Sequence, residues 1–204
     1  MSRVIHVRVI AGISKGRPLK PVPGRSTRPT TDKVKEAVFN RIGPFFEGGR
    51  GLDLYSGSGA LGIEALSRGL DEMIFVDRDP KAIEVVKENV NRCGFEEKSE
   101  IYRNDARHAL KVIERRGLAF TVIFLDPPYF QQKLTADLQK IDAANLLEPG
   151  GMAVIEHHES VILAGSYGKL MLDRSETYGG KTVISVFRRH NTNQKPEVGS
   201  QRPE

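Results

Sequence analysis

Short apolar segments alternate with amphipathic segments through the middle of the chain, and this alternation constrains the fold more than any other feature. The apolar segments are GLDLY (51–55), MIFVDRD (73–79), EIYRND (100–105), AFTVIFLD (119–126) and GGMAVIEH (150–157). The segments between them have helical periodicity over 60–69, 80–94, 106–117 and about 131–146. Strands that alternate with helices predict βαβ units, and therefore a doubly wound α/β domain with a mostly parallel sheet and helices on both faces.

The two ends of the chain have different patterns. Residues 1–24 contain VIHVRVIAG, which alternates like a strand, and SKGRPLK, which has hairpin turn residues. We expect a basic β-hairpin over 1–24, a domain over 25–190 whose first helix spans about 31–43 with Thr30 or Thr31 as its cap, and a disordered tail over 191–204. Two strands within 166–190 would complete a seven-stranded sheet as an antiparallel edge.

The charge of the chain is unevenly distributed. The net charge is +5, but residues 1–31 hold seven basic residues and no acid, whereas residues 32–180 hold 19 basic and 24 acidic residues. A basic arm on an acidic body predicts a polyanionic partner, and nucleic acid is the first candidate. We assign RNA contact to the basic residues of the arm: Arg8, Lys15, Arg17, Lys20 and Arg25.

Composition excludes several other classes of protein. A single cysteine rules out an intrachain disulfide, and no apolar run approaches the ~20 residues of a membrane span, so we expect a cytoplasmic protein. The five histidines lack metal-ligand spacing, and we expect His157 to be a hydrogen-bonded histidine at a strand end, without a metal. Nothing in the sequence demands more than a monomer.

Acidic residues end the first four strands or follow them closely: Asp53, Asp77, Asp105 and Asp126. Because parallel strands finish at one edge of a sheet, these carboxylates should gather where such folds bind ligands. The segment after Asp53 matches G-x-G-x-x-G from Gly57 to Gly62, and Asp77 follows 20 residues after Gly57. That spacing also fits a dinucleotide-binding oxidoreductase.

Two features count against a dinucleotide. About 50 residues precede the glycine motif, although in dinucleotide-binding domains the motif usually opens the domain. Asp53, four residues before Gly57, would repel a pyrophosphate. A carboxylate there suits a ligand that carries an ammonium group, as S-adenosylmethionine (SAM) does.

A family resemblance supports SAM as the ligand. DLYSGSGALG (53–62) resembles motif I of the Rossmann-like class I SAM-dependent methyltransferases. VRVIAGISKGRPLKPV (7–22), TRPTTDKVKEAVFN (27–40) and DPPY (126–129) are together similar to the RsmD-like family. Members of that family methylate N2 of guanine 966 in 16S ribosomal RNA of the small ribosomal subunit.

The resemblance implies roles for individual residues. It places the cofactor against the RPT stretch, motif I and the acids that follow the next two strands: Arg28, Thr30, Asp53, Tyr55, Ser56, Gly57, Ser58, Gly59, Asp77, Arg78, Asp105 and Ala106. Asp53 would lie near the amino group of SAM, Asp77 would accept hydrogen bonds from the ribose hydroxyls, and Asp105 with Ala106 would meet the adenine. The catalytic motif would be Asp126, Pro127, Pro128 and Tyr129.

The DPPY segment has a chemical rationale. The lone pair of an exocyclic amine is delocalised into the base, so the enzyme has to aim hydrogen-bond acceptors at its N–H groups. The Asp126 carboxylate and the Pro127 carbonyl are two such acceptors, and Tyr129 can stack on an extruded base. A carboxylate matches the two adjacent donors of guanine, N1–H and N2–H, better than the donor–acceptor edge of adenine.

Three alternatives stay open at this stage. An adenine-N6 methyltransferase of DNA or RNA shares the DPPY motif and differs in its substrate. A nucleotide-cofactor oxidoreductase would bind NAD in place of SAM. A non-catalytic ribosome assembly factor would bind RNA and transfer no methyl group.

Overall fold

The structure is a computed structural model, and it describes residues 7–23, 32–128, 133–178 and 181–190. The first elements are β1 (Val7–Arg8), β2 (Pro18–Leu19), α1 (Asp32–Ile42), β3 (Arg50–Asp53), α2 (Ala60–Ser67), β4 (Glu72–Asp77) and α3 (Pro80–Cys93). Next come η1 (Glu96–Lys98), β5 (Ser99–Arg103), α4 (Ala106–Arg115), β6 (Phe120–Leu125) and α5 (Leu134–Ala143). The last elements are β7 (Leu147–His158), β8 (Ser166–Tyr167), β9 (Leu170–Tyr178) and β10 (Thr182–Arg189). None of the described helices is long and apolar enough to cross a membrane.

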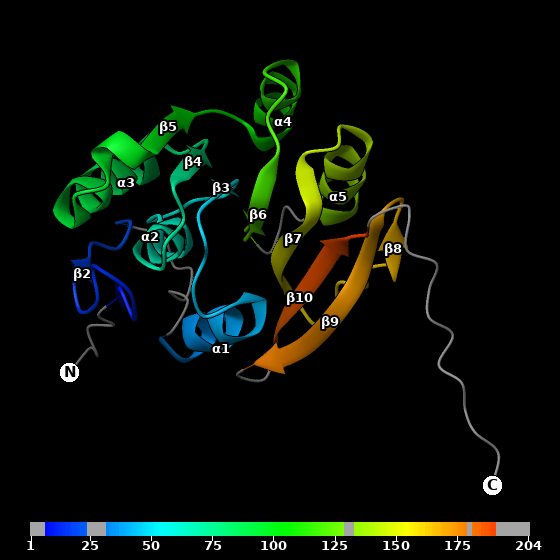
Figure 1. Ribbon diagram of the computed structural model, residues 1–204, viewed down its shortest axis with the longest axis horizontal. Coiled ribbons are helices and arrows are strands. Elements are labelled where there is room, and N and C mark those ends of the chain that lie inside the picture. Colours follow the sequence, from blue (N-terminus) through cyan, green and yellow to red (C-terminus); the bar gives the residue numbers. More distant parts are fainter. Residues whose placement is uncertain (1–6, 24–31, 129–132, 179–180, 191–204) are drawn as a thin grey trace, which may run out of the picture.

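The central sheet has the order β5-β4-β3-β6-β7-β10-β9-β8 (Figure 1). The five strands from β5 to β7 are parallel, and β10 then lies antiparallel between β7 and β9. The predicted α/β architecture is therefore confirmed. The predicted count of seven strands was one too few, because the chain after β7 forms the two-residue strand β8 before β9.

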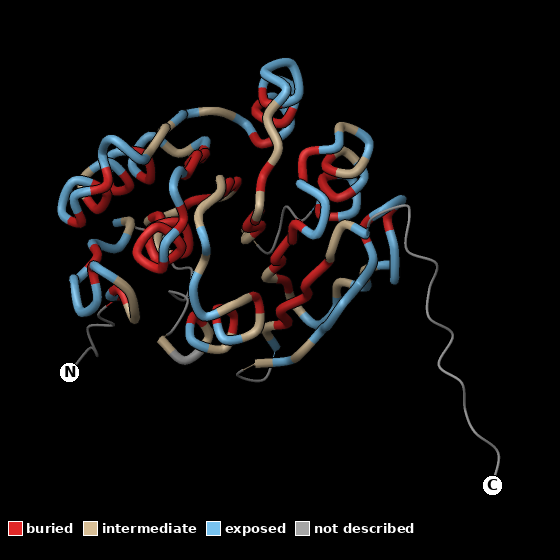
Figure 2. Tube along the Cα trace, in the orientation of Figure 1, coloured by how far each residue is buried: buried red, intermediate tan, exposed pale blue. Residues whose placement is uncertain are grey.

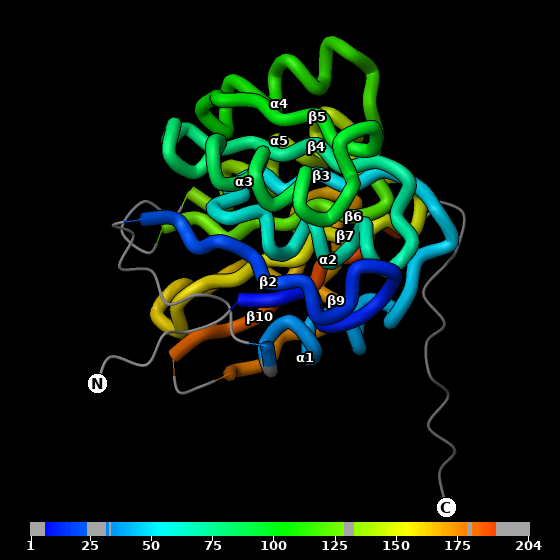
Figure 3. The backbone as a smooth tube through the Cα atoms, turned by 90° about the vertical axis from the view of Figure 1, so that its left-hand side faces the viewer, coloured from blue at the N-terminus to red at the C-terminus, as the bar shows by residue number. Residues whose placement is uncertain are grey.

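Most of the parallel strands of the sheet are buried (Figure 2), and apolar side chains cover both of its faces. On one face they pack against α1, α2 and α3, and on the other against α4 and α5. The N-terminal hairpin of β1 and β2 belongs to the first layer, because Val7, Val9 and Leu19 are members of its core cluster. Figure 3 shows the hairpin lying across the helices of this face.

The loop of the hairpin is fixed at the ends of two helices. Ile13 N–H donates to the Ser67 carbonyl at the end of α2 (2.9 Å), and Ser14 Oγ donates to the Cys93 carbonyl at the end of α3 (3.3 Å). These bonds satisfy carbonyls that a helix leaves without partners. Gly12 permits the contact, because its φ is 83° and a Cβ there would lie 1.7 Å from the Ser67 oxygen.

A fully buried carboxylate joins the hairpin to the domain. Glu64 of α2 accepts hydrogen bonds from the backbone N–H groups of Ile10 (2.8 Å) and Ala11 (3.0 Å). It also pairs with Lys35 Nζ of α1 (3.3 Å) and Arg68 Nε (2.8 Å). Lys35 and Glu64 have no exposed surface, and Arg68 is 4% exposed. Three segments of the chain therefore depend on one side chain.

We expect Glu64→Ala to lower the free energy of unfolding by about 3–5 kcal/mol, because the cations of Lys35 and Arg68 would stay buried without their anion. Urea denaturation followed by circular dichroism measures this loss. Glu84→Ala, on the exposed side of α3, is the matched control and should change stability by less than about 0.5 kcal/mol. Equal effects of the two substitutions would contradict the role given to Glu64.

Candidate active site

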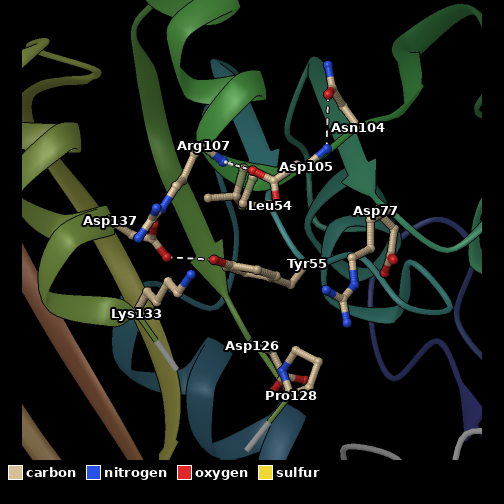
Figure 4. A pocket seen from close by; sticks show the side chains of 12 residues that line it. Leu54, Tyr55, Asp77, Asn104, Asp105, Arg107, Asp126, Pro128, Lys133 and Asp137 are labelled. Atoms are coloured by element: carbon tan, nitrogen blue, oxygen red, sulfur yellow. Dashed lines mark hydrogen bonds between the residues drawn. The ribbon is translucent and has the colours of Figure 1, made fainter. Parts of the chain in front are cut away.

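Four strands deliver their acidic residues to one edge of the sheet, as the sequence predicts. Asp53 ends β3 and Asp77 ends β4. Asp105 follows β5 by two residues and caps α4, where its side chain accepts from Arg107 N–H. Asp126 comes directly after β6. This edge carries a cleft of about 340 Å³ (Figure 4).

The cleft combines predicted and unpredicted residues. Those that sequence analysis singled out are Tyr55, Asp77, Arg78, Asp105, Ala106, Asp126 and Pro128. Those that it missed are Leu54, Asn104, Arg107, Lys133 and Asp137. The predicted residues Arg25, Arg28, Thr30 and Tyr129, with the cap at Thr31 and the tail 191–204, lie outside the described residues.

The turn after β3 is held by its own polar groups. Ser56 Oγ donates to the carbonyls of Asp53 and Val76, both at 2.9 Å. Asn89 of α3 donates to the Ser58 carbonyl (2.9 Å). Ser56 and Ser58 therefore shape the turn, and neither of them lines the cleft.

The backbone conformation and the close packing of the turn explain why position 59 is a glycine. Gly59 has a φ of 78°, a left-handed conformation that most residues avoid, and it begins α2. A Cβ at Gly59 would lie 3.3–3.4 Å from Ile63, Phe75 and Val86, so the turn can pack tightly over the sheet.

The Asp77 carboxylate is held by two backbone amides. Its Oδ2 accepts from Gly57 N–H and its Oδ1 from Asp79 N–H, both at 2.9 Å. The glycine turn and the acid 20 residues later, which the sequence connects only by spacing, are in direct contact.

Asp53 is not among the residues that line the cleft, and it is only 2% exposed. Burial raises the pKa of its carboxyl from 3.8 to about 7. The hydrogen bond from Gly62 N–H opposes this shift, and the charges of Asp126 and Asp77 add to it. Asp53 is thus a carboxyl group whose negative charge the fold disfavours until a cation approaches.

A hydrogen bond joins the two halves of the cleft. Tyr55 OH, from the segment after β3, donates to Asp137 Oδ2 of α5 at 2.6 Å (Figure 4). Burial raises the pKa of both groups, and the shared hydrogen bond raises that of Tyr55 further. Sequence analysis missed Asp137, although an acid on the buried face of α5 beside Leu134, Leu138 and Ile141 is a detectable signal.

His157 is a hydrogen-bonded histidine, as predicted. Its Nε2 lies 2.9 Å from Ser185 Oγ, its Nδ1 lies 3.0 Å from the His158 carbonyl, and burial lowers its pKa. The described residues contain no group of three or more His, Cys, Asp or Glu side chains placed to hold a metal ion.

Comparisons with known proteins identify the family of the chain. The profile of the family described as "Conserved hypothetical protein 95" matches residues 7–187. The "Putative rRNA methyltransferase YlbH" of Bacillus subtilis is 54% identical over 90% of this chain and 99% of its own. The "Ribosomal RNA small subunit methyltransferase D" of Haemophilus influenzae is 33% identical over 74% of this chain and 78% of its own.

Solved structures show the same fold. The "Putative methyltransferase yhhF from Escherichia coli" has a TM-score of 0.76 and 26% identity, covering 91% of this chain and 98% of its own. An RNA methyltransferase from Salinibacter ruber in complex with S-adenosyl-L-homocysteine has a TM-score of 0.58 and 21% identity, covering 83% and 97%. The family profile and the 33% relative each cover most of the chain, so the protein belongs to the Conserved hypothetical protein 95 family of RsmD-like methyltransferases.

Proposed function

We propose that the protein transfers a methyl group from SAM to the exocyclic N2 amine of a guanine in 16S rRNA of the small ribosomal subunit. The observation that supports this most directly is that one cleft is lined by Asp77 and Asp105, which suit SAM, and by Asp126 and Pro128 of the DPP segment, which suits an amine. Relatives named as rRNA methyltransferases support RNA as the substrate. We place this activity in the cytoplasm and assign it to a monomer.

The residues of the cleft fit SAM. Asp77, oriented by two amides, can accept hydrogen bonds from the ribose hydroxyls. Asp105 and Ala106, which line the cleft, can meet the adenine. Asp53 does not line the cleft, but its carboxyl group can stabilise the ammonium group, directly or through water. Bound SAM supplies an electrophilic methyl group on a sulfonium.

Asp126 and Pro127 act on the other substrate. The Asp126 carboxylate can accept from N1–H and N2–H of a guanine, and the Pro127 carbonyl can accept the second N2 proton. These contacts hold the amine in line with the methyl group and draw its lone pair out of the ring. The methylated amine is cationic until a proton leaves, so the carboxylate also stabilises the developing charge.

Methyl transfer from radiolabelled SAM tests the proposal. The acceptors are small ribosomal subunits from cells lacking this enzyme, their naked RNA, and plasmid DNA, and the product nucleoside is identified by mass. Label in N2-methylguanine is the expected result. Label in N6-methyladenine would contradict the assignment of guanine as the substrate. SAM binding without any methyl transfer would favour a non-catalytic assembly factor. Binding of NAD in place of SAM would favour an oxidoreductase.

We expect Asp126→Ala to lower kcat at least a hundredfold while the Kd for SAM changes less than about fivefold, because Asp126 acts on the amine. Single-turnover transfer and calorimetry measure the two quantities. Asp173→Ala, on exposed β9, is the control. Near-normal turnover of Asp126→Ala would show that another group positions the amine.

We expect the tip of the hairpin to contribute more to RNA binding than its base. Arg8 pairs with Asp32 (2.9 Å) and Lys20 with Glu88 (2.6 Å), whereas no such pair forms at Lys15 or Arg17 among the described residues. Lys15→Gln/Arg17→Gln should therefore reduce the slope of log K against log salt by about two, and Arg8→Gln/Lys20→Gln by less. Equal salt slopes of the two double variants in a filter-binding assay would contradict the larger contribution of the hairpin tip.

We expect Asp53→Asn to stabilise the fold and weaken SAM binding. The pKa of Asp53 is raised in the folded protein, so its ionisation costs stability as pH rises from about 4 to about 7, and the cost is constant above that. The variant should match the parent near pH 4 and exceed it at pH 8, by on the order of 1–4 kcal/mol. Thermal unfolding and SAM titration across this range measure both effects.

The exposed acid Glu97 provides the control for that experiment. Glu97→Gln should shift neither the pH profile of stability nor the affinity for SAM. A destabilised Asp53→Asn at pH 8 would show that the carboxylate has a compensating partner in the free protein.

A further inference from the structure

We propose that α4 forms a second RNA-contacting surface, on the opposite face of the sheet from the N-terminal hairpin. The inference rests on the proposed function and adds to it the place where RNA next to the target guanine binds. The surface is a row of three exposed cations, Arg107, Lys111 and Arg115, which we call the α4 ridge.

The spacing of the ridge follows from helix geometry. The three cations lie four residues apart, so they form one row about 12 Å long along α4. The opposite side of the helix is apolar and buried against the sheet through Ala106, Ala109, Leu110 and Ile113. The core therefore fixes the direction in which the ridge faces solvent.

Two acids near the α4 ridge pair with cations that do not belong to it, so they do not neutralise the ridge. Glu100 is engaged by Arg116 through two hydrogen bonds of 2.7 and 2.9 Å, and Glu114 pairs with Lys140 of α5. Among the described residues, Lys111 and Arg115 form no ion pair. The negative total charge of residues 32–180 therefore conceals a cationic helix.

The ridge is continuous with the cleft. Arg107 lines the cleft together with Arg78 and Lys133, and its side chain extends toward Asp137 in Figure 4. A nucleotide whose base lies at Asp126 would have its backbone near this rim, and the adjoining phosphates could follow the ridge outward. This continuity connects the surface to the substrate of the cleft.

A mostly apolar hollow on the other flank of α4 adds an exposed aromatic ring to this part of the surface. It has a volume of about 170 Å³ and lies between α4 and β5, with Tyr102 (45% exposed) and Val112 among its lining residues. Asn104 lines both this hollow and the cleft. The cation that lines the hollow is Arg116, and the ridge residues lie outside it. An exposed ring on the same helix layer as a row of cations is typical of sites for single-stranded nucleic acid, where a base stacks while phosphates are neutralised, and this favours RNA over other polyanions.

The two basic surfaces lie on opposite sides of the molecule. The hairpin packs in the core layer of α1, α2 and α3, whereas α4 packs in the layer of α5 (Figure 1). RNA that passes across the carboxyl edge of the sheet, where the cleft opens, could reach both surfaces. Contact on both sides would orient the target nucleotide from two directions.

Lys111→Gln/Arg115→Gln tests the proposal, because neither residue lines the cleft. Binding to unmodified small subunits should weaken about tenfold, and the slope of log K against log salt should fall by about two. The KM for subunits should rise by a similar factor, while kcat, the Kd for SAM and the melting temperature stay near those of the parent. Arg174→Gln/Lys181→Gln, exposed near the other edge of the sheet, removes the same charge as a control.

If the parent is active in the assay and Lys111→Gln/Arg115→Gln has the same affinity, KM and salt slope as the parent, the proposed RNA contact of α4 is wrong and the proposed function still stands. Failure of the parent itself to methylate subunits would instead overturn the proposed function. Loss of binding to phosphatidylglycerol vesicles, with subunit binding unchanged, would assign the ridge to a membrane and also overturn the proposal. An equal loss in the control pair would show that only total charge matters.

Discussion

Glu64 is the contact on which the arrangement of the protein depends. A carboxylate in a nearly all-buried helix is costly unless several donors surround it, and here two amides and two cations do so. Those donors come from the hairpin, α1 and the end of α2. The geometry of one anion thus sets where the N-terminal hairpin lies relative to the cleft.

The cleft depends on a second electrostatic constraint, the gathering of carboxylates at one sheet edge. Burial makes the ionisation of Asp53 costly, and the charges of Asp126 and Asp77 add to that cost. A cationic ligand relieves this cost on arrival. The free protein accordingly gives up stability for a site that is ready for a sulfonium or ammonium group.

Much of this structure could be predicted from the sequence, because periodicity and turn residues act locally. The parallel strands, the hairpin and the acids at the sheet edge follow from that information. Strand β8 could not be predicted, since two residues have no period. Asp137 and the Glu64 cluster were missed because their partners, Tyr55, Lys35 and Arg68, lie on other elements. The α4 ridge was overlooked because charge was summed over segments and not over surfaces.

The hydrogen bond between Tyr55 and Asp137 has a consequence for how this family diverges. Its two ends lie 82 positions apart, one beside the glycine turn after β3 and one in α5. A phenylalanine at position 55 would leave a buried acid without its donor, so a relative with that change is better served by an apolar residue at position 137. The two positions are therefore expected to change together across homologues, because one hydrogen bond connects them.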